Sequence, residues 1–344
     1  MDLNPSRQST PEALVRVTFL GDTLVGGEGQ PVLDRSGPGW AFDGIRDLLE
    51  PADLVVVNHE GPITNRTHPE DKLDTGRKRY WYRAAPNSVE ALLDVGVRVA
   101  SLANNHVLDF GVGGLEDTID ALDVAGIAHC GAGPTRAAAR KPALIEVGGL
   151  RLGFLSFMQH YKIYVAEDAY ASRTRPGPQR LNLERARVDL AKLQDHADLR
   201  IALVHWGRNY RKVNPRQQRL GAELCNAGAD IVIGHHPHVP QRIGINQGRP
   251  ICYSLGNGPL GTPGRFHSGR LPYGLVVSFD IDTAARPRQI TADLILVDNS
   301  RVGFQPQIAD GDEDRRVLRR LLPRDLDWCR SPGGGFTAPL APVF

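Results

Sequence analysis

The sequence predicts an α/β fold in which layers of helices cover buried strands. Short runs of Val, Ile and Leu recur along the chain without regular polar alternation, which is typical of strands buried on both faces. Stretches with helical periodicity separate several of these runs, and this favours a layered α/β arrangement. The sequence shows no internal repeat of short fixed period.

Predicted strands and helices follow one another over most of the chain. In chain order the strands are 14–20, 54–57, 97–102, 150–157, 199–204, 230–233 and 251–255, and the helices are 114–125, 183–196 and 215–227. Two further strands, 274–281 and 290–297, have no helix between them, so we expect an antiparallel hairpin at a sheet edge. The Gly- and Pro-rich tail from Ser331 is expected to be irregular.

Composition places the chain among globular proteins. It has 344 residues, of which 41% are hydrophobic and 23% charged, with a formal net charge of +2. We expect one domain over 14–300, an irregular or disordered N-terminus over 1–13, and a C-terminal extension over 301–344 that packs on the domain.

The same numbers argue against several functional classes. The near-neutral charge gives no electrostatic footprint for nucleic acid. No apolar run reaches the roughly 18 residues of a membrane span, and residues 1–12 lack the apolar core of a signal peptide. We therefore expect a cytoplasmic protein without a membrane partner. The four cysteines stand at neither metal-finger nor redox spacing, which suits a reducing compartment; they are Cys130, Cys225, Cys252 and Cys329.

Polar residues able to bind a metal follow nearly every predicted strand before residue 257. In open α/β sheets the carboxyl ends of the strands meet at one crevice, so these side chains should converge. They are Asp22, Glu60, Asn105, His106, His205, His236, His238 and Asn257. Burying such a set without a partner would be costly, and a bound metal removes that cost.

The ligand types indicate two divalent ions. Carboxylate and imidazole together, without thiolate, suit Mn, Fe or Zn. There are more candidates than one tetrahedral shell holds, whereas two ions that share Glu60 would use them all.

Each position also has an ordinary structural interpretation. Asp22 is compatible with a turn or helix cap, Glu60 with a loop charge, and Asn104–Asn105 with turn formers. His205 is compatible with a hydrogen-bonded core histidine. The segment GHHPH at 234–238 is the exception, because three imidazoles in four residues at a strand end have no ready structural explanation.

Six motifs resemble one known family. They are, in order, FLGDTLVGG, VVVNHEGPIT, SLANNHVLDFG, HWGRNY, GADIVIGHHPHVPQ and YSLGN. This series resembles the CapA, or poly-γ-glutamate capsule synthesis, family, a branch of the calcineurin-like metallophosphoesterases. The resemblance covers about residues 15–257. It implies a layered calcineurin-like fold, with a central β sandwich flanked by helices and a dinuclear metal centre between the sheet ends.

The resemblance also implies a role for each residue. His106 would protonate the leaving group, and Asp109 would orient His106 through a hydrogen bond. His235 precedes the matching His-Pro-His unit and stays outside the ligand set. The metal ligands would be Asp22 and His238 on the first ion, Asn105, His205 and His236 on the second, and Glu60 between them.

The sequence departs from the family pattern beside this site. Leu24 stands where Asp-x-His is usual, so the first ion lacks one ligand, and His59 is a possible substitute. Asn209, His59 and Gly258 replace other usual residues. These changes suggest a substrate unlike the capsule polymer, or a changed metal occupancy.

Several residues are candidates for substrate contact. The stretch 72–83, KLDTGRKRYWYR, interleaves basic and aromatic residues and would either grip a phosphate or carboxylate or form a solvated loop. Arg208, close to His205, is the stronger anion contact. The substrate-binding candidates are Arg208, Arg83, Asn257 and His59.

These residues predict a metal-dependent hydrolase. A metal-bound hydroxide would attack a phosphoester, or an amide or γ-glutamyl bond, of a small anionic or peptide-like substrate. The superfamily favours the phosphoester, and the CapA resemblance favours the amide. The alternative is a non-catalytic accessory protein of polyglutamate or polyamide synthesis, against which the His106–Asp109 pair argues.

Overall fold

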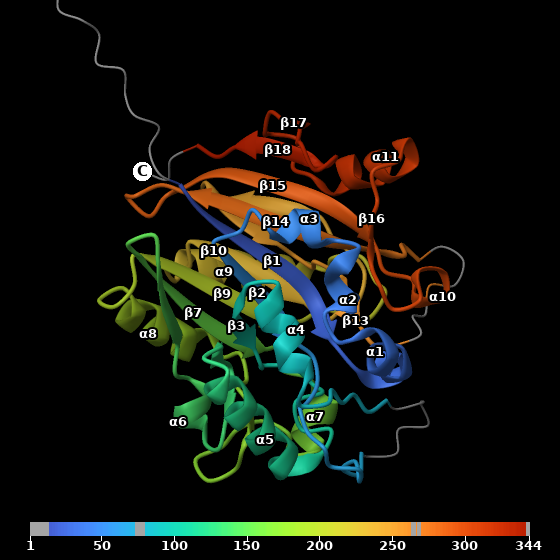
Figure 1. The fold of residues 1–344 in the computed structure, drawn as a ribbon. Helices are drawn as coiled ribbons and strands as arrows, with labels where there is room; N and C mark the ends of the chain where they lie inside the picture. The colour runs from blue at the N-terminus through green and yellow to red at the C-terminus, as the bar shows by residue number, and fades with distance from the viewer. Residues whose placement is uncertain (1–13, 73–79, 263–265, 267–269, 342–344) are drawn as a thin grey trace, which may run out of the picture.

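Two β-sheets packed face to face form the centre of the protein, and helices cover their outer faces (Figure 1). The computed structural model describes residues 14–72, 80–262, 266 and 270–341. The predicted layered α/β fold with a central sandwich is therefore confirmed.

The first sheet has ten strands. β1, β2, β3 and β4 run parallel to one another, whereas β14 pairs antiparallel with β1. The order is β17 (Cys329–Arg330), β18 (Phe336–Pro339), β15 (Pro287–Leu296), β14 (Tyr273–Ile281), β1 (Val15–Leu24), β2 (Leu54–His59), β3 (Val97–Ser101) and β4 (Ala128–Cys130); β13 (Asn257–Leu260) also pairs with β1, and β16 (Gln307–Ile308) with β15.

The second sheet has six strands. Its four central strands are parallel, and the strand at each edge is antiparallel to its neighbour. The order is β11 (Ile243–Asn246), β12 (Arg249–Cys252), β10 (Ile231–His235), β9 (Leu199–His205), β7 (Leu150–Met158) and β6 (Ala143–Val147). A separate small pair joins β5 (Ala132–Gly133) to β8 (Gly177–Pro178).

Helices cover the outer face of each sheet. The described helices are η1 (Gly27–Gly29), α1 (Gln30–Ser36), α2 (Trp40–Asp43), α3 (Arg46–Leu49), α4 (Ser88–Asp94), α5 (Gly111–Val124), α6 (Arg136–Ala139), α7 (Lys162–Ala166), α8 (Leu183–Leu193), α9 (Pro215–Asn226), α10 (Asn299–Val302) and α11 (Asp312–Leu321). α1 to α5 bury their apolar residues against the first sheet, and α8 and α9 pack on the second.

The main core lies between the sheets, where inward side chains of both interdigitate. Phe19 and Val56 from the first sheet meet Phe154, Ile201 and Ile233 from the second. Each such side chain contributes roughly 1.5–3 kcal/mol through its burial. This core fixes the two sheets relative to each other and so aligns their carboxyl ends.

Two sequence-based expectations about the C-terminal part were wrong. β14 and β15 do form an antiparallel hairpin, but it lies inside the sheet, because β1 covers one side and β18 and β16 the other. The tail from Ser331 was expected to be irregular, yet it supplies β18, whose Phe336 and Ala338 enter the core. The short apolar pattern of β18 was hidden among Gly and Pro residues.

Other boundaries differ by a few residues. The predicted strand 251–255 ends at Cys252, and the chain bends before β13 begins at Asn257. The expectation for residues 1–13 lies outside the described residues. Among the described helices, none is both long and apolar enough to cross a membrane.

Candidate metal centre

The predicted ligands come together at the carboxyl ends of both sheets. The first sheet supplies Asp22 in β1, Glu60 after β2 and Asn105 after β3, and the second supplies His205 at the end of β9 with His236 and His238 after β10. The convergence expected from strand topology is thus what the structure shows, although the ends come from two sheets instead of one.

One group of potential ligand atoms belongs to Asp22, Glu60 and His238, all buried, and these atoms lie within 4.8 Å of one another. The Nδ1 of His238 is 3.3 Å from Oδ2 of Asp22 and 3.7 Å from Oε2 of Glu60. Asn257 lies beside Asp22 in the β1–β13 register, and its Oδ1 is 3.0 Å from the same Nδ1.

A second group belongs to Glu60, His205 and His236. The Nε2 of His205 lies 3.6 Å from Oε1 of Glu60 and 2.7 Å from Oδ1 of Asn105. The His205 and His236 rings are 4.6 Å apart between centroids. Glu60 is therefore common to both groups and presents one oxygen to each.

Burial shifts the pKa values of these side chains. Burial lowers the pKa of His236 to about 3 and the pKa of His205 well below its usual value, so both imidazoles are neutral and offer lone pairs. Burial, with the charges of Asp22 and Asp109, raises the pKa of Glu60 well above its usual value. For Asp22, burial acts to raise the pKa, but the hydrogen bond with His238 and the charges of His238, His235 and His236 together hold the pKa below its usual value.

Glu60 carries the clearest sign of a missing partner. Both of its carboxylate oxygens are buried and, among the described residues, neither has a hydrogen-bond partner. The Nδ1 of His236 is also buried and has no hydrogen-bond partner among the same described residues. A buried polar group without a partner costs about 1–3 kcal/mol, so divalent cations fit this donor set.

Backbone conformation at the histidine segment is unusual. His236 and His238 have φ values of 95° and 55°, in the left-handed region that non-glycine residues seldom adopt. The His236 amide donates to Oδ2 of Asp22 at 3.1 Å, which ties this turn to β1. Backbone strain held at converging ligands is typical of functional sites.

Close packing of the β1 backbone also positions Asp22. The amide of Asp22 donates to the carbonyl of Gly256 at 2.9 Å. A Cβ on Gly21 would lie 2.1 Å from that carbonyl oxygen, so only glycine allows this approach.

His106 and Asp109 form a pair next to the two groups. The Nδ1 of His106 lies 2.7 Å from Oδ2 of Asp109, and the His106 ring stacks on Tyr82 at 3.9 Å between centroids. The Tyr82 amide donates to Asp109, and Lys72 Nζ lies 2.6 Å from Oδ1 of Asp109. Burial lowers the pKa of His106, and the charge of Asp109 opposes that effect.

The remaining predicted residues occupy different places. His59 is buried and belongs to neither group; its Nδ1 lies 2.8 Å from the Gly61 carbonyl. Arg208 is exposed and lines a cavity beside the ligands. Arg83 donates to the Arg66 carbonyl and lies over the Phe110 ring. Of the stretch 72–83, residues 73–79 lie outside the described residues.

Leu24 points into an apolar environment. It is buried in the cluster that includes Leu260, and its Cδ1 lies 3.0 Å from the position a Cβ would take on Gly61. The place of the usual histidine is therefore occupied by core packing.

Three residues that position the side chains of this site were not singled out from the sequence. Asn58 donates to Oδ1 of Asp22 at 2.8 Å, and Asn104 donates to the His59 carbonyl and accepts from the His106 amide. Lys72 was treated only as part of a basic stretch. Asn58 and Asn104 stand next to predicted ligands at strand ends, which was an available signal, whereas the position of Lys72 depends on a long loop.

The fold and this cluster define a class: a two-sheet α/β protein with a carboxylate–histidine cluster between its sheet ends. The model of the family described as "Bacterial capsule synthesis protein PGA_cap" matches residues 16–258. The chain therefore belongs to this family, and the resemblance to CapA proteins is confirmed.

Curated relatives carry related names. The chain is 32% identical over 248 residues to "Capsule biosynthesis protein CapA" of Bacillus anthracis, covering 70% of this chain and 58% of that protein. It is 37% identical over 214 residues to a "Probable polyglutamine synthesis accessory protein" of Mycobacterium tuberculosis, covering 60% and 55% respectively. The chain thus matches little more than half the length of these relatives.

A solved structure shares the fold. The chain superposes on a structure described as a novel phosphatase from Mycoplasma pneumoniae with a TM-score of 0.51 at 15% identity, covering 83% of this chain and 95% of that one. At this identity the similarity concerns the fold alone.

Proposed function

We propose that this protein is a metal-dependent hydrolase with a dinuclear centre. The observation that carries the proposal concerns Glu60. Its two buried oxygens have no hydrogen-bond partner among the described residues, and each faces a separate group of potential ligands. Asp22 and His238 would hold one divalent ion, Asn105, His205 and His236 the other, and Glu60 both. Mn, Fe and Zn suit this mixture of imidazole, carboxylate and amide.

Two such ions would lower the pKa of a water molecule and neutralise negative charge on the substrate oxygens. The protein's own residues supply the rest. His106 is placed beside the cluster to donate a proton to the leaving group, and Asp109 holds its Nδ1 side so that Nε2 faces away from Asp109. Tyr82 fixes the plane of the ring by stacking.

The substrate is an anionic ester or amide. A phosphoester is the first choice, supported by the fold shared with a phosphatase. An amide or γ-glutamyl bond is the second, supported by the names of the CapA relatives. Both reactions would use the same ligands and the same acid.

The test combines metal analysis with two assays. Protein purified with Mn is expected to hold two ions per chain and to hydrolyse either an aryl phosphodiester or a γ-glutamyl anilide. His106→Ala should lower kcat about 100-fold or more, whereas His196→Ala, at an exposed histidine that follows the end of α8, should not. Less than one ion per chain, or equal rates for His106→Ala and wild type, would refute the proposal.

A non-catalytic accessory role is the second candidate. It is favoured by the name of the mycobacterial relative, a probable synthesis accessory protein. On this view the ions would be structural, and no substrate would be turned over. Metal-replete protein that is inactive on both substrates would favour this role.

A further inference from the structure

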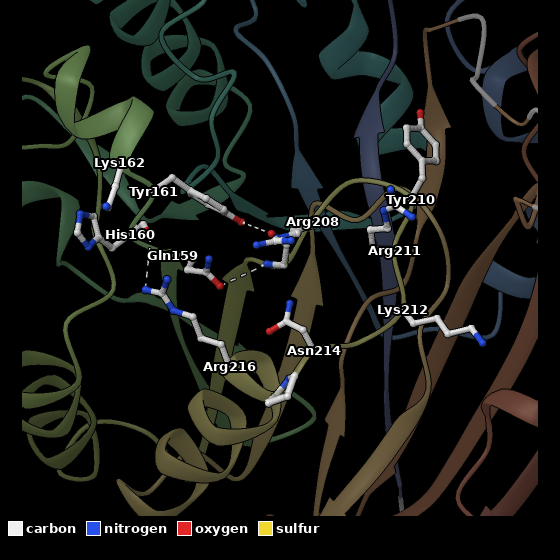
Figure 2. A pocket seen from close by; sticks show the side chains of 12 residues that line it. Gln159, His160, Tyr161, Lys162, Arg208, Tyr210, Arg211, Lys212, Asn214 and Arg216 are labelled. Carbon is white, nitrogen blue, oxygen red and sulfur yellow. Dashed lines mark hydrogen bonds between the residues drawn. The ribbon is translucent and has the colours of Figure 1, made fainter. Parts of the chain in front are cut away.

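A basic cavity adjoins the candidate metal centre. It has a volume of about 1060 Å³ and is lined by residues 159–162 and by residues of the segment 207–216 (Figure 2). Five cationic side chains line it: Lys162, Arg208, Arg211, Lys212 and Arg216. No Asp or Glu is among its described lining residues.

The cations of this cavity are not paired with acidic side chains of the described structure, although Arg216 donates a hydrogen bond to the His160 carbonyl at 3.5 Å. All five are exposed, and none forms an ion pair with a carboxylate among the described residues. This differs from other surface arginines, such as Arg140 and Arg151, which pair with Asp189 and Asp198. A chain with a net charge of only +2 therefore concentrates five unneutralised positive charges at one cavity.

A helix end adds to the positive potential. Asn214, Pro215 and Arg216 line the cavity and form the N-terminal turn of the twelve-residue helix α9. The N-terminus of a helix carries partial positive charge and favours anions. The cations and the helix end thus act in the same sense.

Two tyrosines that line the cavity, Tyr161 and Tyr210, also lie beside histidines of the candidate metal centre. The Tyr161 ring lies 5.4 Å from the His236 ring, and the Tyr210 ring lies 5.8 Å from the His238 ring, between centroids. The Tyr161 hydroxyl donates to the Gly207 carbonyl at 3.1 Å, and the Tyr210 amide donates to the Pro237 carbonyl at 2.7 Å. A ligand in the cavity would therefore lie directly beside the histidine ligands.

We infer that this cavity, hereafter the basic pocket, is a subsite for a second anionic group of the substrate, remote from the bond that is cleaved. The inference rests on the proposed function and extends it to substrate class. A pocket of this volume is at the upper end of small-molecule sites, which is far more than one phosphate or carboxylate needs. The substrate is therefore an oligoanion, with successive phosphates or carboxylates along a short chain.

Binding measurements on the full-length, metal-loaded protein test this inference. The probes are γ-linked triglutamate and tripolyphosphate, each compared with its single unit, glutamate or inorganic phosphate. Wild type is expected to bind at least one oligoanion more tightly than its single unit. Arg211→Gln with Lys212→Gln should weaken that binding about tenfold, as loss of two exposed ion pairs implies, and leave binding of the single unit unchanged.

A matched double variant controls for net charge. Lys192→Gln with Arg219→Gln removes two exposed cations that do not line the basic pocket, and it should bind like wild type. Equal losses in both double variants, or no preference for either oligoanion, would overturn the inference. Binding of a single-stranded oligonucleotide, but of neither oligoanion, would also overturn it and would assign the pocket to nucleic acid.

The result separates this inference from the proposed function. If the protein hydrolyses the aryl phosphodiester but shows no preference for an oligoanion, the proposed function stands and the basic pocket is not a substrate subsite. Oligoanion binding that depends on Arg211 and Lys212, in a protein that hydrolyses nothing, would keep the subsite and refute the hydrolase.

Discussion

Lys72 Nζ lies 2.6 Å from Oδ1 of Asp109, the carboxylate whose other oxygen contacts His106. The aspartate, only 1% exposed, is thereby held between a cation and an imidazole. Lys72 belongs to the loop that follows β2, so a residue distant in sequence from His106 completes its surroundings. We regard Lys72 as a positioning residue.

Replacing Lys72 by Met should disturb catalysis and not metal binding. Without the ammonium group, Asp109 loses a charged partner and holds the His106 ring less well, so we expect kcat to fall about tenfold with little change in KM. The measurement is steady-state kinetics with metal content in parallel. Lys72→Arg should recover part of the rate, and Lys192→Met is the control. A changed metal content with unchanged kcat would contradict this role.

Replacing Glu60 by Gln should weaken metal binding and stabilise the metal-free protein. The two buried carboxylate oxygens, which have no hydrogen-bond partner in the described part of the chain, cost free energy when no cation is present, and the amide carries less of that cost. We expect metal affinity to fall at least about tenfold and the unfolding midpoint in EDTA to equal or exceed that of wild type. Glu146→Gln, at an exposed glutamate, should change neither quantity.

Removing the metals should loosen the ends of both sheets. Residues 58–61 and 235–239 carry ligands from different sheets, and the ions would join them. Chelation is expected to speed amide hydrogen exchange in these segments, while the β14–β15 hairpin, which carries no ligand, keeps its protection. If these segments exchange at the same rates with and without chelator, the ions do not join the sheets.

Asp293 should give the stability a pH dependence of its own. Burial raises its pKa to about 6, despite hydrogen bonds from Ser331 and Gly335. Between about pH 4 and 6 the folded state therefore holds a proton that the unfolded state has lost, so the free energy of unfolding falls as pH rises through this range. The free energy of unfolding of Asp293→Asn, relative to that of wild type, should therefore rise by about 2 kcal/mol from pH 4 to pH 7.

Denaturant unfolding at both pH values measures this difference. Asp298→Asn is a suitable control, because Asp298 caps the short helix α10 at the surface. A difference between wild type and Asp293→Asn that does not vary with pH would mean that Asp293 does not titrate in this range.

The parts predicted from sequence are those that local pattern determines. Uninterrupted apolar runs located the central strands of both sheets, and the polar residues after them located Asp22, Glu60, Asn105 and the histidines. Their convergence followed from parallel topology alone. Their grouping around Glu60 is what the distances show.

The parts that sequence did not predict depend on distant pairing. The strand β18 has a weak pattern of its own and exists because β15 offers it a hydrogen-bonding edge. Lys72 reaches Asp109 through a loop whose course no periodicity indicates. The basic pocket likewise unites Lys162 with residues 208–216, and only the packing of α7 beside the segment after β9 brings them together.

The position of β14 has a consequence for any shortened form of this protein. The family match ends at residue 258, and a chain cut there would keep every proposed metal ligand. It would nevertheless remove β14 from β1, the strand that carries Asp22, and leave the backbone of five consecutive residues, 15–19, without its antiparallel partner strand. An exposed edge strand of this kind pairs with strands of other chains, so such a fragment would aggregate before its chemistry could be assayed.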